Sequence, residues 1–447
     1  MAEDETLAGV RRLADGSASP DERRRAVRAL VRLAAREEGQ VTDGGARSGT
    51  EIAARDYDAA TSAVLARVQA AGREIDRERE EAESLAAELL ALPEGQQTLV
   101  AVNHRRYQTW SVAERVREES FRVGRESPVR AVHLARLALL LAERVDPAPA
   151  SERLRHDLEA AAWGQLGNAL RLRGELPEAE ASFARARERV EQGSGDPLVE
   201  AGLLSLCAAL RNDQSRFREA EVLARRAYAL FGKVGDRHQQ GRALFTLANA
   251  LGCDGRLDEA LVALGRARSL LDAERDPRMA WGAVHNAVIY LVEAERFDEA
   301  KRLLATDVEE ADRVGLSPLD RLRLLWVEGR ISLGLGDIAA AEPILRQAAE
   351  GLVERGYGLE GATAALDLAV CFVEQRRWAE VRELAARLYP VFAAQEVESE
   401  ALVALTVLRD AALAGTAEVA VVREVLAFLH RLDRDPTARF RPAGPSA

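Results

Sequence analysis

The chain has 447 residues and a formal net charge of -11, with 47% apolar and 30% charged residues. This balance indicates a folded protein rather than a disordered one. Aromatic residues make up only 5%, and an apolar fraction dominated by Ala, Leu and Val favours closely packed helices over a β-sandwich. The acidic charge excludes the basic balance typical of nucleic-acid binders, so no nucleic-acid partner is expected.

Three cysteines, far apart in the sequence, make no disulfide framework and are compatible with a reducing cytoplasm. The first residues are acidic and are not followed by the basic and apolar segments of a signal peptide. No run of about 18 apolar residues occurs, so no membrane span and no membrane partner are expected. These features together predict a cytoplasmic location.

The N-terminal part is expected to divide into three segments. Residues 1–38 read as two short helices, the second opened by a capping Ser19 and by Pro20. Residues 39–49 are Gly-rich and predict a flexible linker. Residues 50–92 predict one long amphipathic helix, because their apolar positions recur at intervals of three, four and seven. Such a helix lies on a partner surface or forms a short coiled coil.

A repeat begins further along the chain. An apolar helix, a polar turn and a short triplet ending in alanine recur, and these alanines are Ala179, Ala220, Ala260, Ala300 and Ala341. The steps between them are 41, 40, 40 and 41 residues. A fixed period of this length is the signature of a solenoid of stacked helix pairs. Gly174, Gly255 and Gly336 precede the second helix of three pairs, where helix ends favour the left-handed conformation.

The first unit identifies the type of repeat. Trp163, Leu166 and Gly167 begin a W-x2-L-G pattern, and Ala179 and Phe183 complete an A-x3-F pattern. The small Gly167 and Ala179 let two helices approach, while the larger side chains fill the space between them. These residues resemble a tetratricopeptide repeat. Later units keep a large and a small residue at the same step, except that Glu328 replaces the large apolar residue before Gly329.

The resemblance covers residues 105–432 and implies an all-α, right-handed superhelical solenoid of 40–41-residue helix-turn-helix repeats with a helical N-terminal extension. Residues 433–447 are expected to be a disordered tail. The N-terminal segment is also similar to the small zinc-finger module of bacterial anti-sigma factors. Ala29, Leu33 and Arg36 occupy the positions of its metal ligands, so no metal is expected.

No catalytic pattern stands out. The six histidines are scattered, no H-E-x-x-H, Walker loop, G-x-G-x-x-G or G-x-S-x-G occurs, and the cysteines are expected to pack as small apolar residues within helices. The acidic run at 73–83 predicts a solvated helix face paired with neighbouring arginines. Neither an enzymatic activity nor a cofactor is therefore expected.

A peptide-binding groove is the better candidate. In tetratricopeptide-like architectures the first helix of each unit lines the concave face, and asparagines there hold an extended peptide backbone, because the amide both donates and accepts. The residues expected in this groove are Asn168, Asn249, Asn286, Arg171, Arg242, His285, Arg323, Trp326 and Arg330. They predict a mildly basic groove with one aromatic platform, suited to an acidic segment or a C-terminal carboxylate. The alternative is that the asparagines cap or bridge helices and the arginines only keep the protein soluble.

Two functions from different classes remain open. The first is a protein- or peptide-binding adaptor, in bacterial regulation or signalling, whose partner could be a sigma factor or a neighbouring signalling protein. The second is a structural scaffold of a multiprotein complex containing a partner protease, toxin or sigma factor, without a peptide groove. The two differ in whether binding needs the groove residues or the N-terminal helices.

Overall fold

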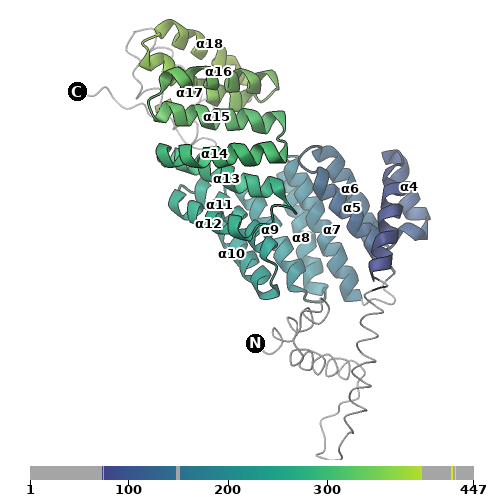
Figure 1. Ribbon diagram of the computed structural model, residues 1–447. Helices are drawn as coiled ribbons and strands as arrows, with labels where there is room; N and C mark the ends of the chain where they lie inside the picture. The colour runs from purple at the N-terminus through teal and green to yellow at the C-terminus, as the bar shows by residue number, and fades with distance from the viewer. Residues whose placement is uncertain (1–72, 74, 147–151, 395–423, 426–427, 429–447) are drawn as a thin grey trace, which may run out of the picture. The chain divides into compact units, whose positions relative to one another are not determined.

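The computed structural model describes residues 73, 75–146, 152–394, 424–425 and 428 (Figure 1). All regular structure in these residues is helical, which confirms the all-α repeat prediction. The segments predicted at 1–38, 39–49 and 433–447, and the likeness to an anti-sigma module, lie outside the described residues. The chain forms two compact units: unit 1 includes residues up to Leu210 and Leu223–Arg237, and unit 2 includes Arg211–Val222 and residues from His238 onward.

Unit 1 begins with the end of the long amphipathic helix, which is helical at 75–90 and turns at 91–93. The helices that follow are α4 (Glu94–Asn103), η1 (Arg105–Tyr107), α5 (Trp110–Val123), α6 (Pro128–Ala142), α7 (Glu152–Leu172), α8 (Leu176–Gln192) and α9 (Pro197–Asp213). The apolar stripe of the first helix packs into the core of this unit, because Ala82 and Leu89 are buried there with Leu134 and Phe183. This half of the helix therefore packs on its own chain.

Unit 2 continues the helix pairs. Its helices are α11 (Arg237–Cys253), α12 (Leu257–Leu270), α13 (Pro277–Glu293), α14 (Phe297–Val314), α15 (Pro318–Gly334), α16 (Ile338–Glu354), α17 (Gly358–Glu374) and α18 (Trp378–Ala394), and α10 (Phe217–Val234) is shared between the two units. Figure 1 shows these helices following one another in chain order. Asp276, Ser317 and Asp337 accept backbone hydrogen bonds at the starts of α13, α15 and α16, which satisfies otherwise unpaired amides.

The repeat alanines lie where each second helix meets its partner. All five alanines of the period, at 179, 220, 260, 300 and 341, have no exposed surface. A Cβ built on Gly167 would lie 2.8 Å from the buried Phe183 ring, and one built on Gly329 would lie 2.6 Å from Leu345. Glu328, which replaces the large apolar residue of the pattern, is half-buried, and the small residue at the close contact in this pair is Gly329. Small residues thus permit the close approach of paired helices.

The turn inside each helix pair has a left-handed residue. Gly174, Gly255 and Gly336 have φ angles of 88°, 81° and 80°, as the sequence predicts. The same turn position in the intervening pairs is occupied by Ser215, Glu295 and Arg376, with φ angles of 57°, 56° and 58°. These three residues adopt a conformation that costs non-glycine residues about 1–2 kcal/mol, so the turn geometry is imposed by the packing of the helices it joins.

Arginines at the starts of second helices link neighbouring pairs. Arg256 donates to Glu259 on its own helix and to Glu221 of the preceding second helix. Arg296 joins Glu299 to Asp258, and Arg377 joins Glu380 to Glu342, in the same way. These bonds tie successive repeats of unit 2 together at the turns.

Candidate functional site

One face of unit 2 is formed by the first helices of successive pairs. These first helices are α11, α13, α15 and α17. On each of them, the side chains that face the first helix of the next pair are three, four, seven or eight residues apart, so they form a stripe along the helix. We call this surface the A face, and its residues are Arg242, Asn249, Arg278, Gly282, Asn286, Arg323, Trp326, Arg330, Glu360 and Asp367. All are half-buried except Asp367, which is buried.

Ion pairs run along one edge of the A face. Arg242 lies 2.8 Å from Asp276, the residue that caps the start of the following first helix, and Arg278 reaches Asp320 on α15. Arg323 makes two bonds to Glu360, of 2.9 and 2.6 Å. The arginine at each step, of which Arg242 and Arg323 were expected and Arg278 was not, therefore has a carboxylate from the next repeat beside it. The A face carries paired charges of both signs instead of an unpaired row of arginines.

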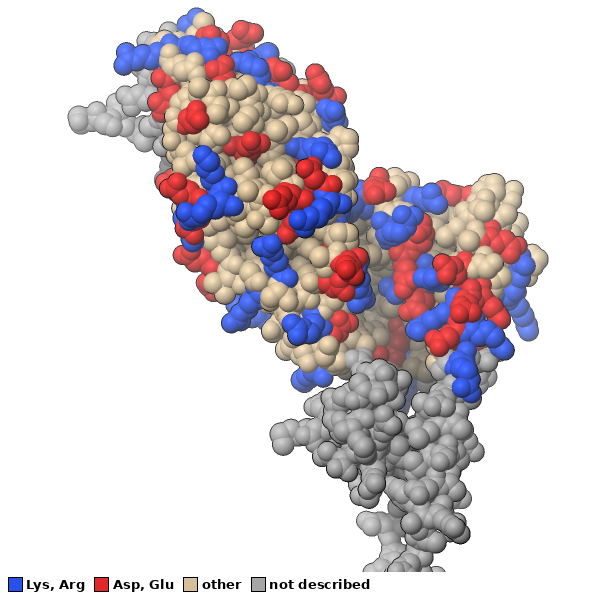
Figure 2. Space-filling view, in the orientation of Figure 1, with Lys and Arg blue, Asp and Glu red and all other residues tan. Residues whose placement is uncertain are grey.

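The wider surface shows the same mixture. In Figure 2 positive and negative side chains are interspersed over the face in view, without a broad area of one sign. Paired charges give specificity and orientation more than affinity. An acidic ligand would therefore have to displace an existing carboxylate before binding these arginines.

An amide pair lies between α11 and α13. The Asn286 Nδ2 donates to Asn249 Oδ1 at 2.9 Å, and the Tyr290 hydroxyl donates to the same oxygen at 3.4 Å. The two asparagines therefore do bridge helices, as the alternative in the sequence analysis supposed. Each still keeps hydrogen-bonding groups that no described residue engages: Asn249 Nδ2 and Asn286 Oδ1.

An aromatic side chain and a buried acid lie between α15 and α17. The Trp326 indole nitrogen donates to Asp367 at 2.7 Å, and the Arg330 guanidinium lies 3.9 Å from the same oxygen. Burial raises the pKa of Asp367, and the attraction of Arg330 and the bond from Trp326 oppose that rise only partly. Trp326 remains half-buried, so part of its ring is available to a ligand.

His285 does not belong to this face. Its ring is 6% exposed, stacks on Trp281 at 4.8 Å and lies 2.9 Å from Asp307, which has no exposed surface. The pair is enclosed between α13 and α14. His285 therefore does not line the groove as the sequence predicts, because one residue along a helix rotates a side chain by about 100° and turns it from the A face toward the paired helix.

Asn168 and Arg171 lie in unit 1, on α7. Asn168 is 3% exposed and accepts hydrogen bonds from Arg171 at 3.0 and 3.3 Å. The amide oxygen of Asn168 is thus engaged within its own helix.

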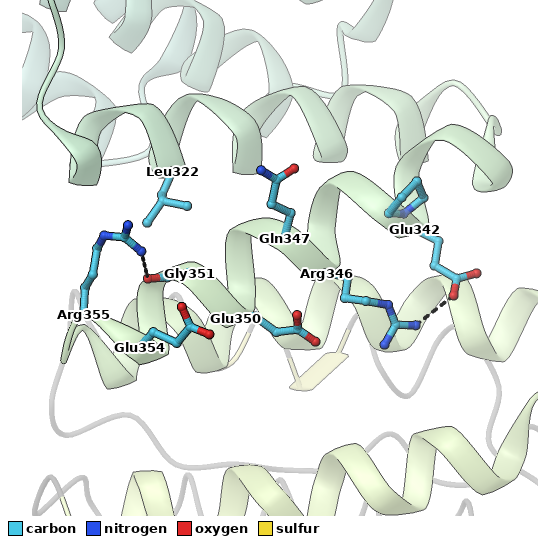
Figure 3. Close-up of a pocket in the computed structure, with 9 residues that line it drawn as sticks. Leu322, Glu342, Arg346, Gln347, Glu350, Gly351, Glu354 and Arg355 are labelled. Atoms are coloured by element: carbon cyan, nitrogen blue, oxygen red, sulfur yellow. Dashed lines mark hydrogen bonds and ion pairs between the residues drawn. The ribbon is translucent and has the colours of Figure 1, made fainter.

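A separate feature is an open trough of about 510 Å³ on α15 and α16. Figure 3 shows Arg346 reaching Glu342 and Arg355 reaching the carbonyl of Gly351 along its rim. Hydrogen bonds from Gln375, Arg377 and Arg346 lower the pKa of Glu342 although burial acts in the opposite direction. Both arginines of the rim are thus already engaged by groups of α16, which makes the trough a weaker candidate than the A face.

The remaining reactive groups have structural surroundings. Cys371 is buried and its pKa is raised to about 12 by burial, which makes its thiol unreactive. Among the described residues there is no group of three or more His, Cys, Asp or Glu side chains able to hold a metal ion. Within that same part of the chain, no helix is both long enough and apolar enough to cross a membrane.

Comparison with known proteins connects the chain to solved structures only. No protein-family model and no curated protein matches the sequence. A Rap protein crystallised with competence and sporulation factor matches with 14% identity, over 73% of this chain and 88% of that one, at a TM-score of 0.55. Also similar are aspartyl phosphate phosphatase F from Bacillus subtilis (13% identity, 70% and 94% covered, TM-score 0.41) and the Rap conjugation gene regulator of plasmid pLS20 with the Phr* peptide (12%, 71% and 98%, 0.42).

The first of these matches shows that the chain shares a tetratricopeptide-like helical repeat fold. At this identity the likeness concerns the fold alone. The function therefore has to be argued from the residues of the A face.

Proposed function

We propose that this protein is a non-catalytic adaptor that binds an extended peptide segment of a partner on the A face of unit 2. The observation that carries the proposal is the amide pair, because Asn249 and Asn286 keep a free donor and a free acceptor side by side on a half-buried surface. A peptide backbone offers the complementary acceptor and donor, whatever its sequence.

The rest of the A face supports this reading. Trp326 offers a partly exposed ring, and aromatic rings contribute much of the binding energy at peptide interfaces. Gly282 lies between Arg278 and Asn286 on α13 and has no side chain, so a ligand can approach the helix backbone there. The similar Rap protein is described in complex with competence and sporulation factor, which supports a ligand-binding regulatory role for this fold.

The balanced charge of the A face limits the charge that a bound peptide can carry, which the sequence alone does not. Each A-face arginine already has a carboxylate beside it, so displacement would offset much of the gain from an acidic ligand. We therefore expect a ligand of mixed or low charge, held by its backbone and by apolar side chains, in place of a strongly acidic segment.

A random heptapeptide library displayed on phage tests the function. Peptides selected on the wild-type protein would be measured against Gly282→Leu and Gly265→Leu. A Cβ on Gly282 makes an ordinary contact of 3.6 Å with Phe245, and one on Gly265 of α12 touches nothing within 4 Å, so neither Cβ clashes, and binding is compared once circular dichroism shows that both variants keep the wild-type helical content. We expect at least about a tenfold loss of affinity in Gly282→Leu, from about 1.4 kcal/mol or more, and none in Gly265→Leu. Equal binding to both variants, or no enrichment at all, would reject the A face.

A further inference from the structure

The oxygen of Asn249 receives two hydrogen bonds from neighbouring side chains. Asn286 donates to it from one turn of α13 and Tyr290 from the next turn of the same helix. An amide oxygen has two lone pairs, so both are used. The nitrogen of Asn249 then has both of its hydrogens left, and no described residue accepts them.

Tyr290 is held in place by the shape of α11. Its ring lies over Gly252, where an added Cβ would come within 2.6 Å of the hydroxyl oxygen, and the residue is only 8% exposed. Glycine at 252 therefore admits the ring, and the ring brings the hydroxyl to Asn249. Because the ring is enclosed, its hydroxyl keeps one position.

We propose that Tyr290 is a positioning residue which, with Asn286, fixes the Asn249 amide as a hydrogen-bond donor, so that Asn249 recognises a main-chain carbonyl oxygen of the bound peptide. This inference rests on the proposed function and adds the direction of its central contact. The free Asn286 Oδ1 beside it is an acceptor, which disfavours a carboxylate and favours a peptide N–H. A carbonyl with a nearby N–H is the pattern of a peptide backbone.

The orientation of the amide can be measured without a ligand. In a 15N–1H TROSY spectrum the side-chain amide signals of Asn249 are those absent from Asn249→Asp. Both Asn249 protons should exchange with water rapidly, whereas one Asn286 proton should be protected by its bond to Asn249. A protected Asn249 proton beside two freely exchanging Asn286 protons would overturn the proposal.

Binding tests the consequence, with library-selected peptides made with amidated C-termini. Asn249→Asp keeps an acceptor for Asn286 and Tyr290 but cannot donate, so it should fold normally and bind about tenfold more weakly. Tyr290→Phe keeps the ring on Gly252 and frees the amide to turn, so it should bind about threefold more weakly. Glu350→Gln, on an exposed acid of α16, should bind as wild type.

The binding results distinguish a failure of the donor role of Asn249 from a failure of the proposed peptide-binding function. Peptides that need Gly282 but bind Asn249→Asp as well as wild type would leave the A face as the binding surface and refute the donor role. If peptides with an amidated C-terminus do not bind while the same peptides with a free C-terminal carboxylate do, Asn249 recognises the carboxylate and not a main-chain carbonyl. If no peptide binds the A face, the proposed function and the recognition half of the inference fail together.

Discussion

The close approach of α7 and α8 depends on Gly167, and replacing it tests the packing directly. A Cβ at this position would lie 2.8, 2.9 and 3.0 Å from three atoms of the Phe183 ring, which is 1% exposed. Leucine adds three further carbons to that Cβ. Because Phe183 is surrounded by the core of unit 1, the ring cannot turn away without moving its neighbours.

The size of the effect follows from two opposing contributions. Overpacking a close-packed core costs about 1–3 kcal/mol or somewhat more, whereas leucine favours a helix over glycine by about 0.8 kcal/mol. We expect Gly167→Leu to lower the free energy of unfolding by about 2 kcal/mol. For a unit of this size that corresponds to a fall in Tm of about 4–8 °C.

Gly265→Leu is the matched control, because Gly265 is exposed on α12 and its Cβ would meet nothing within 4 Å. This variant should gain about 0.8 kcal/mol from helix propensity alone. Thermal unfolding followed by circular dichroism at 222 nm would compare both variants with wild type. An unchanged or raised Tm in Gly167→Leu would refute the account of helix packing.

Four further substitutions test the turns and two acidic side chains, each by thermal or denaturant unfolding. Glu295→Gly should raise the free energy of unfolding by about 0.5–1 kcal/mol, because glycine adopts the left-handed turn without strain. Gly255→Ala should lower it by about 1 kcal/mol. If both substitutions changed stability in the same direction, Glu295 would not be strained. Glu342→Gln should lose about 1 kcal/mol at pH 7. The lowered pKa means that this deficit shrinks as pH falls through that pKa, whereas the control Glu350→Gln should change little at any pH. Asp367→Asn should raise Tm at pH 7, because burial raises the pKa of Asp367 and penalises its charge, and the gain should vanish toward pH 4; a loss at pH 7 would show that the charge is needed.

Much of the fold could be predicted because its signals are local and periodic. The alanine at each step of 40 or 41 residues must be small wherever two helices cross closely, so the period gives the helix pairs directly. Glycines at 174, 255 and 336 likewise mark turns that need a positive φ. Ser215, Glu295 and Arg376 carry no such signal, and only the surrounding helix packing forces their conformation.

The candidate site could be predicted only in part. The asparagines of α11 and α13 were identified as candidates from their place beside the small step, but their bond to each other depends on the rotation between repeats. The partners of the arginines lie 34 to 42 residues away, so pairing also depends on that rotation. Tyr290 was missed, although its distance of 41 residues from Asn249 equals one repeat and could have indicated contact.

The most direct test of the central claim is to locate a bound peptide on the protein. A library-selected peptide carrying benzoylphenylalanine would be photo-crosslinked to the full chain, and the crosslinked residues would be identified by mass spectrometry. The account predicts crosslinks on α11, α13 and α15, near Asn249, Asn286 and Trp326, that disappear in Gly282→Leu. Crosslinks concentrated on second helices, or in the trough along α16, would contradict it.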